Sequence, residues 1–248
     1  MMYLYAITDA PEGPMSEQPG LGGASLLRVT HEDIAAVVSR VDCAEVPVTE
    51  GGLWEHEAVV EALMADGSVL PLRFGAVVAD EAAVESVLQA HHGEFAACLE
   101  CVRGHVEIGL RALWSDAEGS RARDVPAPKL PADATGRAYL LARAREERES
   151  DERRRHAEDL ATKLHAPLAD LATDSTRRAL ATPRLLLTAA YLVARGRVPT
   201  FRREVDALGA AHPALRLLCT GPWPPYNFVT NCVPARGEEE TSDARQRW

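Results

Sequence analysis

The chain has 248 residues, of which 46% are apolar and 26% are charged, and a formal net charge of −10. This composition is typical of a globular protein that buries one large core or two ordinary ones, and the negative charge argues against nucleic-acid binding, which needs clustered Lys and Arg. The N-terminus lacks the basic region of a secretion signal, and no apolar stretch reaches the roughly 18 residues of a membrane span.

The first hundred residues predict alternating strands and helices. Residues 3–8 ("YLYAIT") are an aromatic and β-branched run that indicates a strand, and residues 24–30 and 34–41 indicate a hairpin. Residues 53–66 predict an amphipathic helix that ends at Gly67, because apolar residues recur there at helical spacing. These are Trp54, Val59, Val60, Leu63 and Met64.

The next segments predict an edge strand, a helix and a longer strand. Residues 68–78 return to extended structure, in which Pro71 indicates an edge strand or a bulge. Asp80 is a plausible N-cap for a helix that runs through residue 103. Residues 105–114 alternate between apolar and polar side chains, which predicts a strand that is bulged at its end.

The second half of the chain predicts a long charged helix between a linker and further strands. Residues 115–135 carry three prolines and little apolar content, as a linker or surface loop does. Residues 136–172 predict a helix whose centre is nearly all charge, so we expect its middle to project into solvent and its two ends to touch a core. The remaining elements are two strands joined across Pro183, a helix with Pro199 in its first turn, and a last strand at residues 214–221.

This order of elements predicts the fold class and the domains. From residue 104 onward the order is strand, helix, strand, strand, helix, strand, which is that of a ferredoxin-like fold. We therefore predict an α+β protein with an N-terminal α+β domain, residues 1–103, and a C-terminal domain, residues 104–233. The second domain is expected to be a modified ferredoxin-like βαββαβ unit with a long charged first helix. A polar, disordered tail is expected over residues 234–248.

No motif for catalysis or metal binding is complete in this chain. Cys98 and Cys101 form a C-x-x-C without a second pair at zinc spacing, and the scattered, odd set of five cysteines suggests reduced thiols in the cytoplasm. His56 and Glu57 lack the second histidine of H-E-x-x-H, and the chain has no phosphate-binding loop or nucleophile elbow. We therefore assign no catalytic, cofactor-binding or metal-binding residues and expect no cofactor and no stoichiometric metal.

The stretch "CTGPWPPYNFV", residues 219–229, crowds aromatic residues and prolines near the end of the chain. It could be an active-site loop, a ligand for a proline-reading domain, or a segment that fastens the chain to a domain surface. The last explanation is favoured because the stretch follows directly on a strand and prolines reduce the entropy lost on fixing it. Trp223, Tyr226 and Phe228 would then lie on that surface. Truncation of a buried Trp223 to alanine would cost about 3–5 kcal/mol.

Four stretches in this order resemble the gas vesicle protein F/L family over residues 3–233: "YLYAIT", "HEAVVEALMADGSVLPLRFGAVV", "GRAYLLAR" and "TGPWPPYNFV". The resemblance implies two α+β domains and a non-enzymatic, accessory or minor structural role in gas vesicle assembly. It also implies that the partners are the small hydrophobic shell protein A and other accessory proteins, and that the protein is found in the cytoplasm and at the gas vesicle.

Two questions stay open at the level of the sequence. The first is the class of function, because ferredoxin-like folds host many chemistries and a small-molecule-binding or enzymatic protein is the alternative. The second is the surface that binds the partner. Our first hypothesis for it is the stretch "VLPLRFG", residues 69–75, as a strand near an edge that could accept a partner strand.

Overall fold

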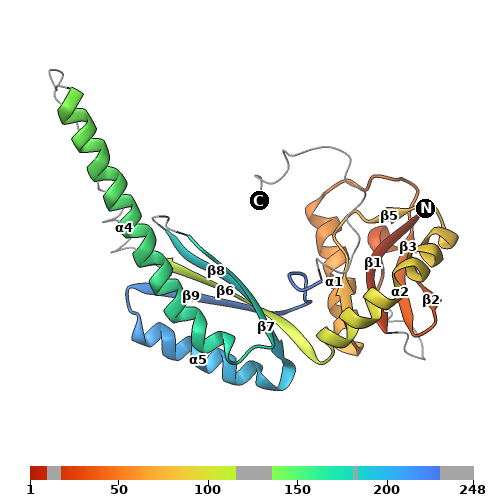
Figure 1. Cartoon of the computed structure of the whole chain (residues 1–248). Coiled ribbons are helices and arrows are strands. Elements are labelled where there is room, and N and C mark those ends of the chain that lie inside the picture. Colours follow the sequence, from red (N-terminus) through yellow and green to blue (C-terminus); the bar gives the residue numbers. More distant parts are fainter. Residues whose placement is uncertain (10–17, 116–135, 181, 183, 230–248) are drawn as a thin grey trace. The chain divides into compact units, whose positions relative to one another are not determined.

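The computed structural model describes residues 1–9, 18–115, 136–180, 182 and 184–229, which fall into two compact units (Figure 1). The first unit comprises Met1–Arg103 together with the segment that begins at Pro224, and the second comprises Gly104–Trp223. Each unit contains one antiparallel sheet with helices packed on it. The predicted mixture of helices and strands is confirmed. The expectations for residues 116–135 and for the tail after residue 233 lie outside the described residues.

The sheet of the first unit is built around β1 (Met2–Asp9). On one side β1 pairs with β3 (Ile34–Arg40), which in turn pairs with β2 (Leu26–His31), so the predicted hairpin is confirmed. On the other side β1 pairs with two short strands, β4 (Val69–Pro71) and β5 (Val77–Val78). Pro71 therefore lies in an edge strand, as predicted.

Two helices cover the two faces of this sheet (Figure 1). α1 (Glu50–Asp66) packs on the face that carries Tyr3 and Tyr5, and α2 (Glu81–Val102) packs on the face that carries Leu4 and Ile7. Both helices begin at a side-chain cap, Thr49 for α1 and the predicted Asp80 for α2. Because both faces are covered, β1 and β3 are buried over almost their whole length.

The face that α1 turns toward the sheet differs from the predicted one at two positions. Trp54, predicted to be in the core, is 66% exposed, whereas His56 is only 3% exposed. His56 precedes Val59, Val60 and Leu63 by three, four and seven residues, so these four side chains share one side of the helix. The prediction for Trp54 was wrong because helical spacing alone counted this aromatic residue with the core positions.

The second unit has the strand order β7-β8-β6-β9, in which all neighbours are antiparallel. Its strands are β6 (His105–Trp114), β7 (Asp174–Ala179), β8 (Leu185–Ala194) and β9 (Leu215–Trp223). A register shift between Ala112 and Leu113 supplies the predicted bulge near the end of β6.

Two helices, α4 (Gly136–Ala169) and α5 (Val198–Ala211), pack on this second sheet. The side chain of Tyr191 on β8 contacts His165 of α4 and Phe201 of α5, so both helices cover the same face. The short turn of 3-10 helix η2 (Arg195–Arg197) joins β8 to α5.

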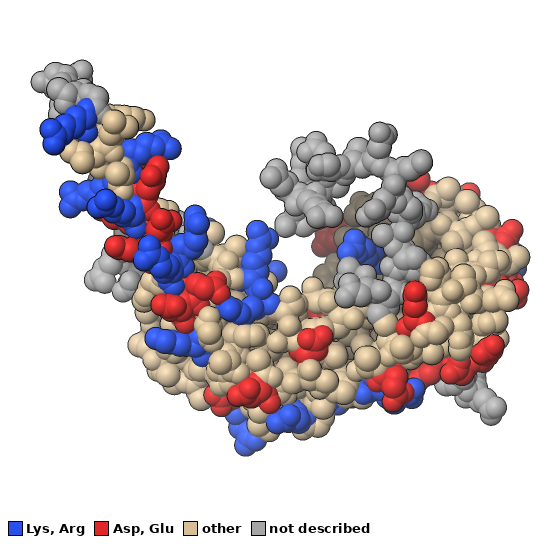
Figure 2. All heavy atoms as spheres, in the orientation of Figure 1, with Lys and Arg blue, Asp and Glu red and all other residues tan. Residues whose placement is uncertain are grey.

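Among the described side chains of α4, those that are buried in the core belong to its C-terminal half. Its buried residues there are Ala157, Ala161, Leu164 and Leu168. At the other end Tyr139, Leu140 and Leu141 are exposed, so the prediction that both ends of this helix meet a core is wrong at its N-terminal end. Basic and acidic side chains intermix along the exposed part (Figure 2), including i,i+4 ion pairs of Arg143 with Glu147 and Arg145 with Glu149.

The stretch after β9 returns to the first unit. Tyr226 contacts Glu57 of α1, and Val229 is buried in the cluster between the sheet and α2. The first compact unit therefore includes residues 224–229, which the predicted boundaries assigned to the second domain. The cause is long-range packing that local periodicity does not report.

The residues that fasten this stretch differ from the predicted anchor. Pro224, Pro225 and Val229 are buried, whereas Trp223 is 39% exposed. Truncating Trp223 would leave no sealed cavity, so the expected cost of about 3–5 kcal/mol does not apply to it. The buried residues that anchor this stretch lie one to six positions after Trp223.

The contrast between the two ends of α4 predicts the outcome of a pair of substitutions. Leu164→Ala should lower the free energy of unfolding by about 2–5 kcal/mol, because this side chain is fully buried. Leu140→Ala on the same helix should change it by less than about 0.5 kcal/mol, because Leu140 is 67% exposed. Urea unfolding of both variants measures the difference, and equal losses would contradict the described packing of α4.

Candidate functional site

The hydroxyl of Tyr3 on β1 is a buried polar group with partners on two other segments of the first unit. It lies 2.8 Å from Nδ1 of His56, and Nε2 of His56 lies 3.1 Å from the carbonyl oxygen of Leu72. Because a carbonyl can only accept, Nε2 carries the proton, and Nδ1 accepts from the Tyr3 hydroxyl. The same hydroxyl oxygen accepts from the backbone N–H of Gly75 at 3.2 Å. All hydrogen-bonding atoms of His56 are therefore satisfied.

A second tyrosine of β1 continues this arrangement. The Tyr5 hydroxyl lies 2.9 Å from Oγ of Ser39 on β3 and accepts from the backbone N–H of Leu21 at 2.7 Å. Leu21 belongs to η1 (Leu21–Gly23), so the hydroxyl ties this turn to the sheet. The rings of Tyr3, Tyr5 and His56 pack on one another with centroids 4.9–5.7 Å apart. We call Tyr3, Tyr5, Ser39 and His56 the Tyr3 network.

Burial keeps the Tyr3 network uncharged near neutral pH. It raises the pKa of Tyr3 to about 12, raises the pKa of Tyr5, and lowers the pKa of His56. A neutral imidazole with both nitrogens engaged offers neither a free lone pair to a metal ion nor a proton to a substrate. The network is therefore suited to holding structure rather than to acid–base chemistry.

Glu57, the neighbour of His56, receives the end of the chain. The Tyr226 hydroxyl donates to Oε2 of Glu57 at 2.8 Å. Burial raises the pKa of Glu57, and burial together with the Glu57 carboxylate raises the pKa of Tyr226. No local pattern in the sequence predicts this contact, because the two residues are 169 positions apart along the chain.

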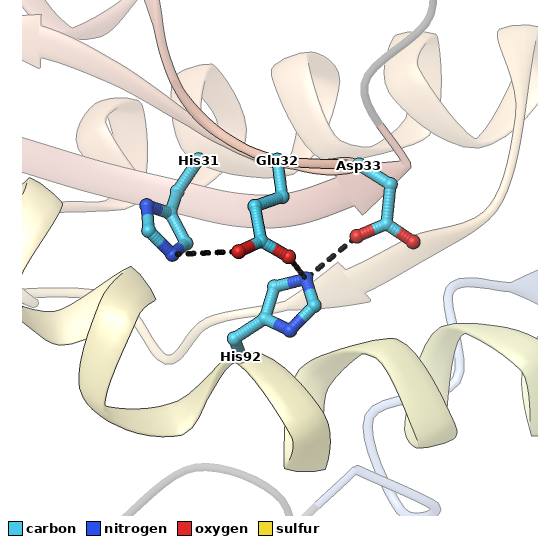
Figure 3. A network of polar contacts seen from close by, with 4 residues as sticks. All are labelled: His31, Glu32, Asp33 and His92. Carbon is cyan, nitrogen blue, oxygen red and sulfur yellow. Dashed lines mark hydrogen bonds and ion pairs between the residues drawn. The ribbon is translucent and has the colours of Figure 1, made fainter.

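A cluster of potential metal ligands lies where the β2–β3 turn meets α2 (Figure 3). Nε2 of His92 is 2.6 Å from Oδ1 of Asp33 and 3.4 Å from Oε2 of Glu32, and His31 lies 4.0 Å from the other oxygen of Glu32. The hydrogen bond from His92 lowers the pKa of Asp33. At 2.6 Å these two atoms bond each other directly, and both carboxylates are exposed. The cluster is explained as a set of ion pairs that joins the hairpin to α2.

The cysteines do not form the reactive pair that a C-x-x-C suggests. Cys101 is a free thiol, whereas Cys98 is disulfide-bonded. The expectation of reduced thiols is therefore wrong for Cys98, because sequence spacing does not report which distant sulfurs approach each other. Cys43 and Cys219 are free, and burial raises the pKa of the Cys219 thiol, which makes it a weak nucleophile.

Comparison with known proteins identifies the family. The family model for "Gas vesicle synthesis protein GvpL/GvpF" matches residues 1–230. This chain belongs to the GvpL/GvpF family. It is 33% identical to gas vesicle protein L of Streptomyces sp. (strain CB03234), over 92% of each chain. Gas vesicle protein F2 of Halobacterium salinarum is 26% identical to it over 92% of this chain and 91% of that protein.

Solved structures of the GvpL/GvpF family share the fold. The crystal structure of GvpF from Anabaena sp. PCC7120 superposes with a TM-score of 0.74 at 20% identity, over 97% of this chain and 99% of that one. The structure of GvpF from Microcystis aeruginosa gives a TM-score of 0.66 at 20% identity, over 92% and 98%. The resemblance inferred from the sequence is confirmed, and membership of the family implies a role in gas vesicle formation. None of the described helices has the length and apolar character that crossing a membrane requires.

Parts of three of the four stretches that carry the family resemblance meet inside the first unit. They supply three members of the Tyr3 network and four residues near it, namely Tyr3, Tyr5, His56, Glu57, Leu72, Gly75 and Tyr226. Gly75 has φ +88°, a conformation that favours glycine, and its N–H donates to the Tyr3 hydroxyl. These residues help to build the interior of the first unit, whereas Tyr139, Leu140 and Leu141 of the fourth stretch are exposed on α4.

The Tyr3 network predicts the effect of removing one hydroxyl. Tyr3→Phe should lower the free energy of unfolding by about 1–3 kcal/mol, since it leaves both Nδ1 of His56 and the Gly75 N–H without a partner. The matched control is Tyr139→Phe, where the tyrosine is exposed and the change should stay within about 0.5 kcal/mol. Denaturant unfolding measures both, and a Tyr3→Phe protein as stable as the parent would refute the network.

His56 predicts a pH dependence of stability. Its pKa in the folded chain lies below the ordinary 6.5, so as pH falls through that value the unfolded chain binds a proton that the folded chain does not. Stability contributed by neutral His56 is therefore present above pH 6.5 and is lost as pH falls. His56→Gln cannot take up this proton, so its free energy of unfolding should fall less than that of the parent between about pH 7.5 and about pH 5.5. The pKa of His165 is also lowered, but that residue is present in both proteins and cancels in the comparison.

Proposed function

We propose that this chain is an accessory or minor structural protein of gas vesicle assembly that binds the small hydrophobic shell protein A. Its membership of the GvpL/GvpF family over residues 1–230 supports a role in gas vesicle formation. We propose that it acts by binding and not by catalysis. The buried positions of Tyr3 and Tyr5 and the fully engaged His56 support this view.

One exposed apolar surface is suited to such a partner. Val48, Leu53 and Trp54 are 73%, 43% and 66% exposed at the start of α1, and we call them the Trp54 patch. Large apolar side chains that gather on a surface mark interaction sites, and tryptophan often supplies much of the binding energy there. Glu50 and Glu55 lie exposed beside the patch along the chain.

The chemistry of a gas vesicle shell supports this assignment. A subunit that faces gas exposes apolar surface, and before assembly that surface promotes aggregation in water. A chain with a net charge of −10 that covers part of the surface would keep the complex dispersed by charge repulsion.

The alternative docking mode, strand addition at "VLPLRFG", is less well supported. The edge at this position consists of two strands of three and two residues, and the Leu72 carbonyl between them is already bonded to His56. Short, interrupted edges resist pairing with another strand. We therefore place the docking surface at the Trp54 patch.

We further infer that the second unit is a modified ferredoxin-like domain. The order of elements β6, α4, β7, β8, α5, β9 and the antiparallel strand order β9-β6-β8-β7 support this inference. The long, exposed N-terminal half of α4 is the modification.

Substitution within the Trp54 patch tests the proposal. Trp54→Glu should weaken co-purification of shell protein A with this chain by at least about tenfold, because it places a charge in an apolar interface. Leu140→Glu is the matched control, since it introduces the same charge at an equally exposed leucine of the second unit. Both variants should unfold at the denaturant concentration of the parent.

Deletion of the gene tests the proposed role in vesicle assembly independently of the proposed docking surface. Vesicle formation should be abolished or impaired, and Trp54→Glu should restore it less well than Leu140→Glu does. If both variants restored vesicle formation equally, the Trp54 patch would not be the docking surface. Normal vesicles without the gene, with no shell protein recovered at low or moderate salt, would favour the small-molecule alternative.

A further inference from the structure

The second sheet has a face that neither α4 nor α5 covers. Side chains alternate between the two faces of a strand. A contact between one side chain and a helix therefore shows on which face the neighbouring side chains lie. On β6, Ile108 lies opposite Tyr191, whose side chain contacts both helices, so Arg111, three residues further, faces the other way. On β7, Arg177 pairs with Glu158 of α4, so Arg178 also faces away from the helices.

Register places three arginines together on this helix-free face. Arg111 lies opposite Thr188 of β8, and Thr188 lies opposite Arg178 of β7, so the two arginines flank one threonine at a backbone separation of about 10 Å. On the other side of β6, Arg216 of β9 lies opposite Leu113, which makes it a diagonal neighbour of Arg111 at about 7–8 Å. We call Arg111, Arg178 and Arg216 the arginine face.

These three side chains are exposed, and within the described residues none of them forms an ion pair. Arg177, by contrast, is neutralised by Glu158 on the covered face. The carboxylates nearest in register on the same face are Glu107 and Asp174, which both lie opposite Leu192. They are four residues along the strands, or about 13 Å, from Arg111 and Arg178. A chain with a net charge of −10 thus presents a concentrated, unneutralised positive surface here.

We propose that the arginine face is a docking site for an acidic helix of another protein. Carboxylates at positions i and i+7 of a helix are about 10.5 Å apart, which matches the separation of Arg111 from Arg178. Arginine binds carboxylates with two parallel hydrogen bonds, which gives geometric selectivity as well as attraction. Leu218, half-buried opposite Arg111 on the same face, provides apolar contact between the charges. This site is separate from the Trp54 patch and does not depend on the proposed shell-binding function.

The test uses the full chain and a labelled helical peptide rich in alanine. Its glutamates lie three and four residues apart along one face, and the matched peptide carries glutamine at the same positions. Fluorescence anisotropy at about 0.15 M salt, where the Debye length is about 8 Å, limits the influence of the overall charge. The parent should bind the glutamate peptide at least about tenfold more tightly than the glutamine peptide.

Two triple variants distinguish binding at the arginine face from non-specific electrostatic attraction to the chain. Arg111→Ala/Arg178→Ala/Arg216→Ala should weaken binding of the glutamate peptide at least about tenfold. Arg148→Ala/Arg153→Ala/Arg154→Ala removes the same charge from exposed positions of α4 and should bind as the parent does. The single variant Arg178→Ala, on the edge strand β7, should weaken binding even if the triple variant folds poorly. Equal binding by the two triple variants, or tighter binding of single-stranded DNA of matched charge, would overturn the proposal.

Discussion

The first unit depends on the need to satisfy two buried hydroxyls. β1 lies in a sheet that is covered on both faces, so the hydroxyls of Tyr3 and Tyr5 have no access to water, and each would cost about 1–3 kcal/mol if left unpaired. Their partners come from α1, β3, η1 and the loop between β4 and β5. The positions of four segments are thereby fixed to one strand. The same requirement turns His56 inward, and its neighbour Glu57 then receives Tyr226 from the end of the chain.

Much of the fold could be predicted because it is encoded locally. The period of the apolar residues located the strands and helices, Asp80 identified the start of α2, and Pro71 identified an edge strand. Local patterns failed where a residue type was misleading. Trp54 resembles a core residue and His56 a surface residue, yet their burial is reversed, because a histidine with two hydrogen-bond partners is as acceptable in a core as an apolar side chain. The exposed apolar start of α4 is a failure of the same kind.

Local sequence patterns do not specify which distant parts of the chain contact each other. The return of residues 224–229 to the first unit and the disulfide of Cys98 depend on which segments approach one another in space. The sequence did single out "GPWPPYNFV" as unusual, and the structure accounts for its prolines, because Pro224 and Pro225 are buried where the stretch packs. Trp223, the largest residue of this stretch, is nevertheless 39% exposed. The sequence motif thus indicated which segment packs on the first unit, but it did not indicate which residues of the segment are buried there.

The net charge and the local charges of this chain act over different distances. A charge of −10 repels an acidic partner over long range, but screening at physiological salt confines electrostatic effects to about 8 Å. Arg111 is within about that distance of Arg216 and about 10 Å from Arg178, so a carboxylate that reaches the face responds mainly to the arginines. At low salt the overall repulsion extends further and opposes the approach. Recognition of an acidic helix should therefore depend on the spacing of these side chains and on near-physiological salt, and net charge alone is a poor guide to the partners of this protein.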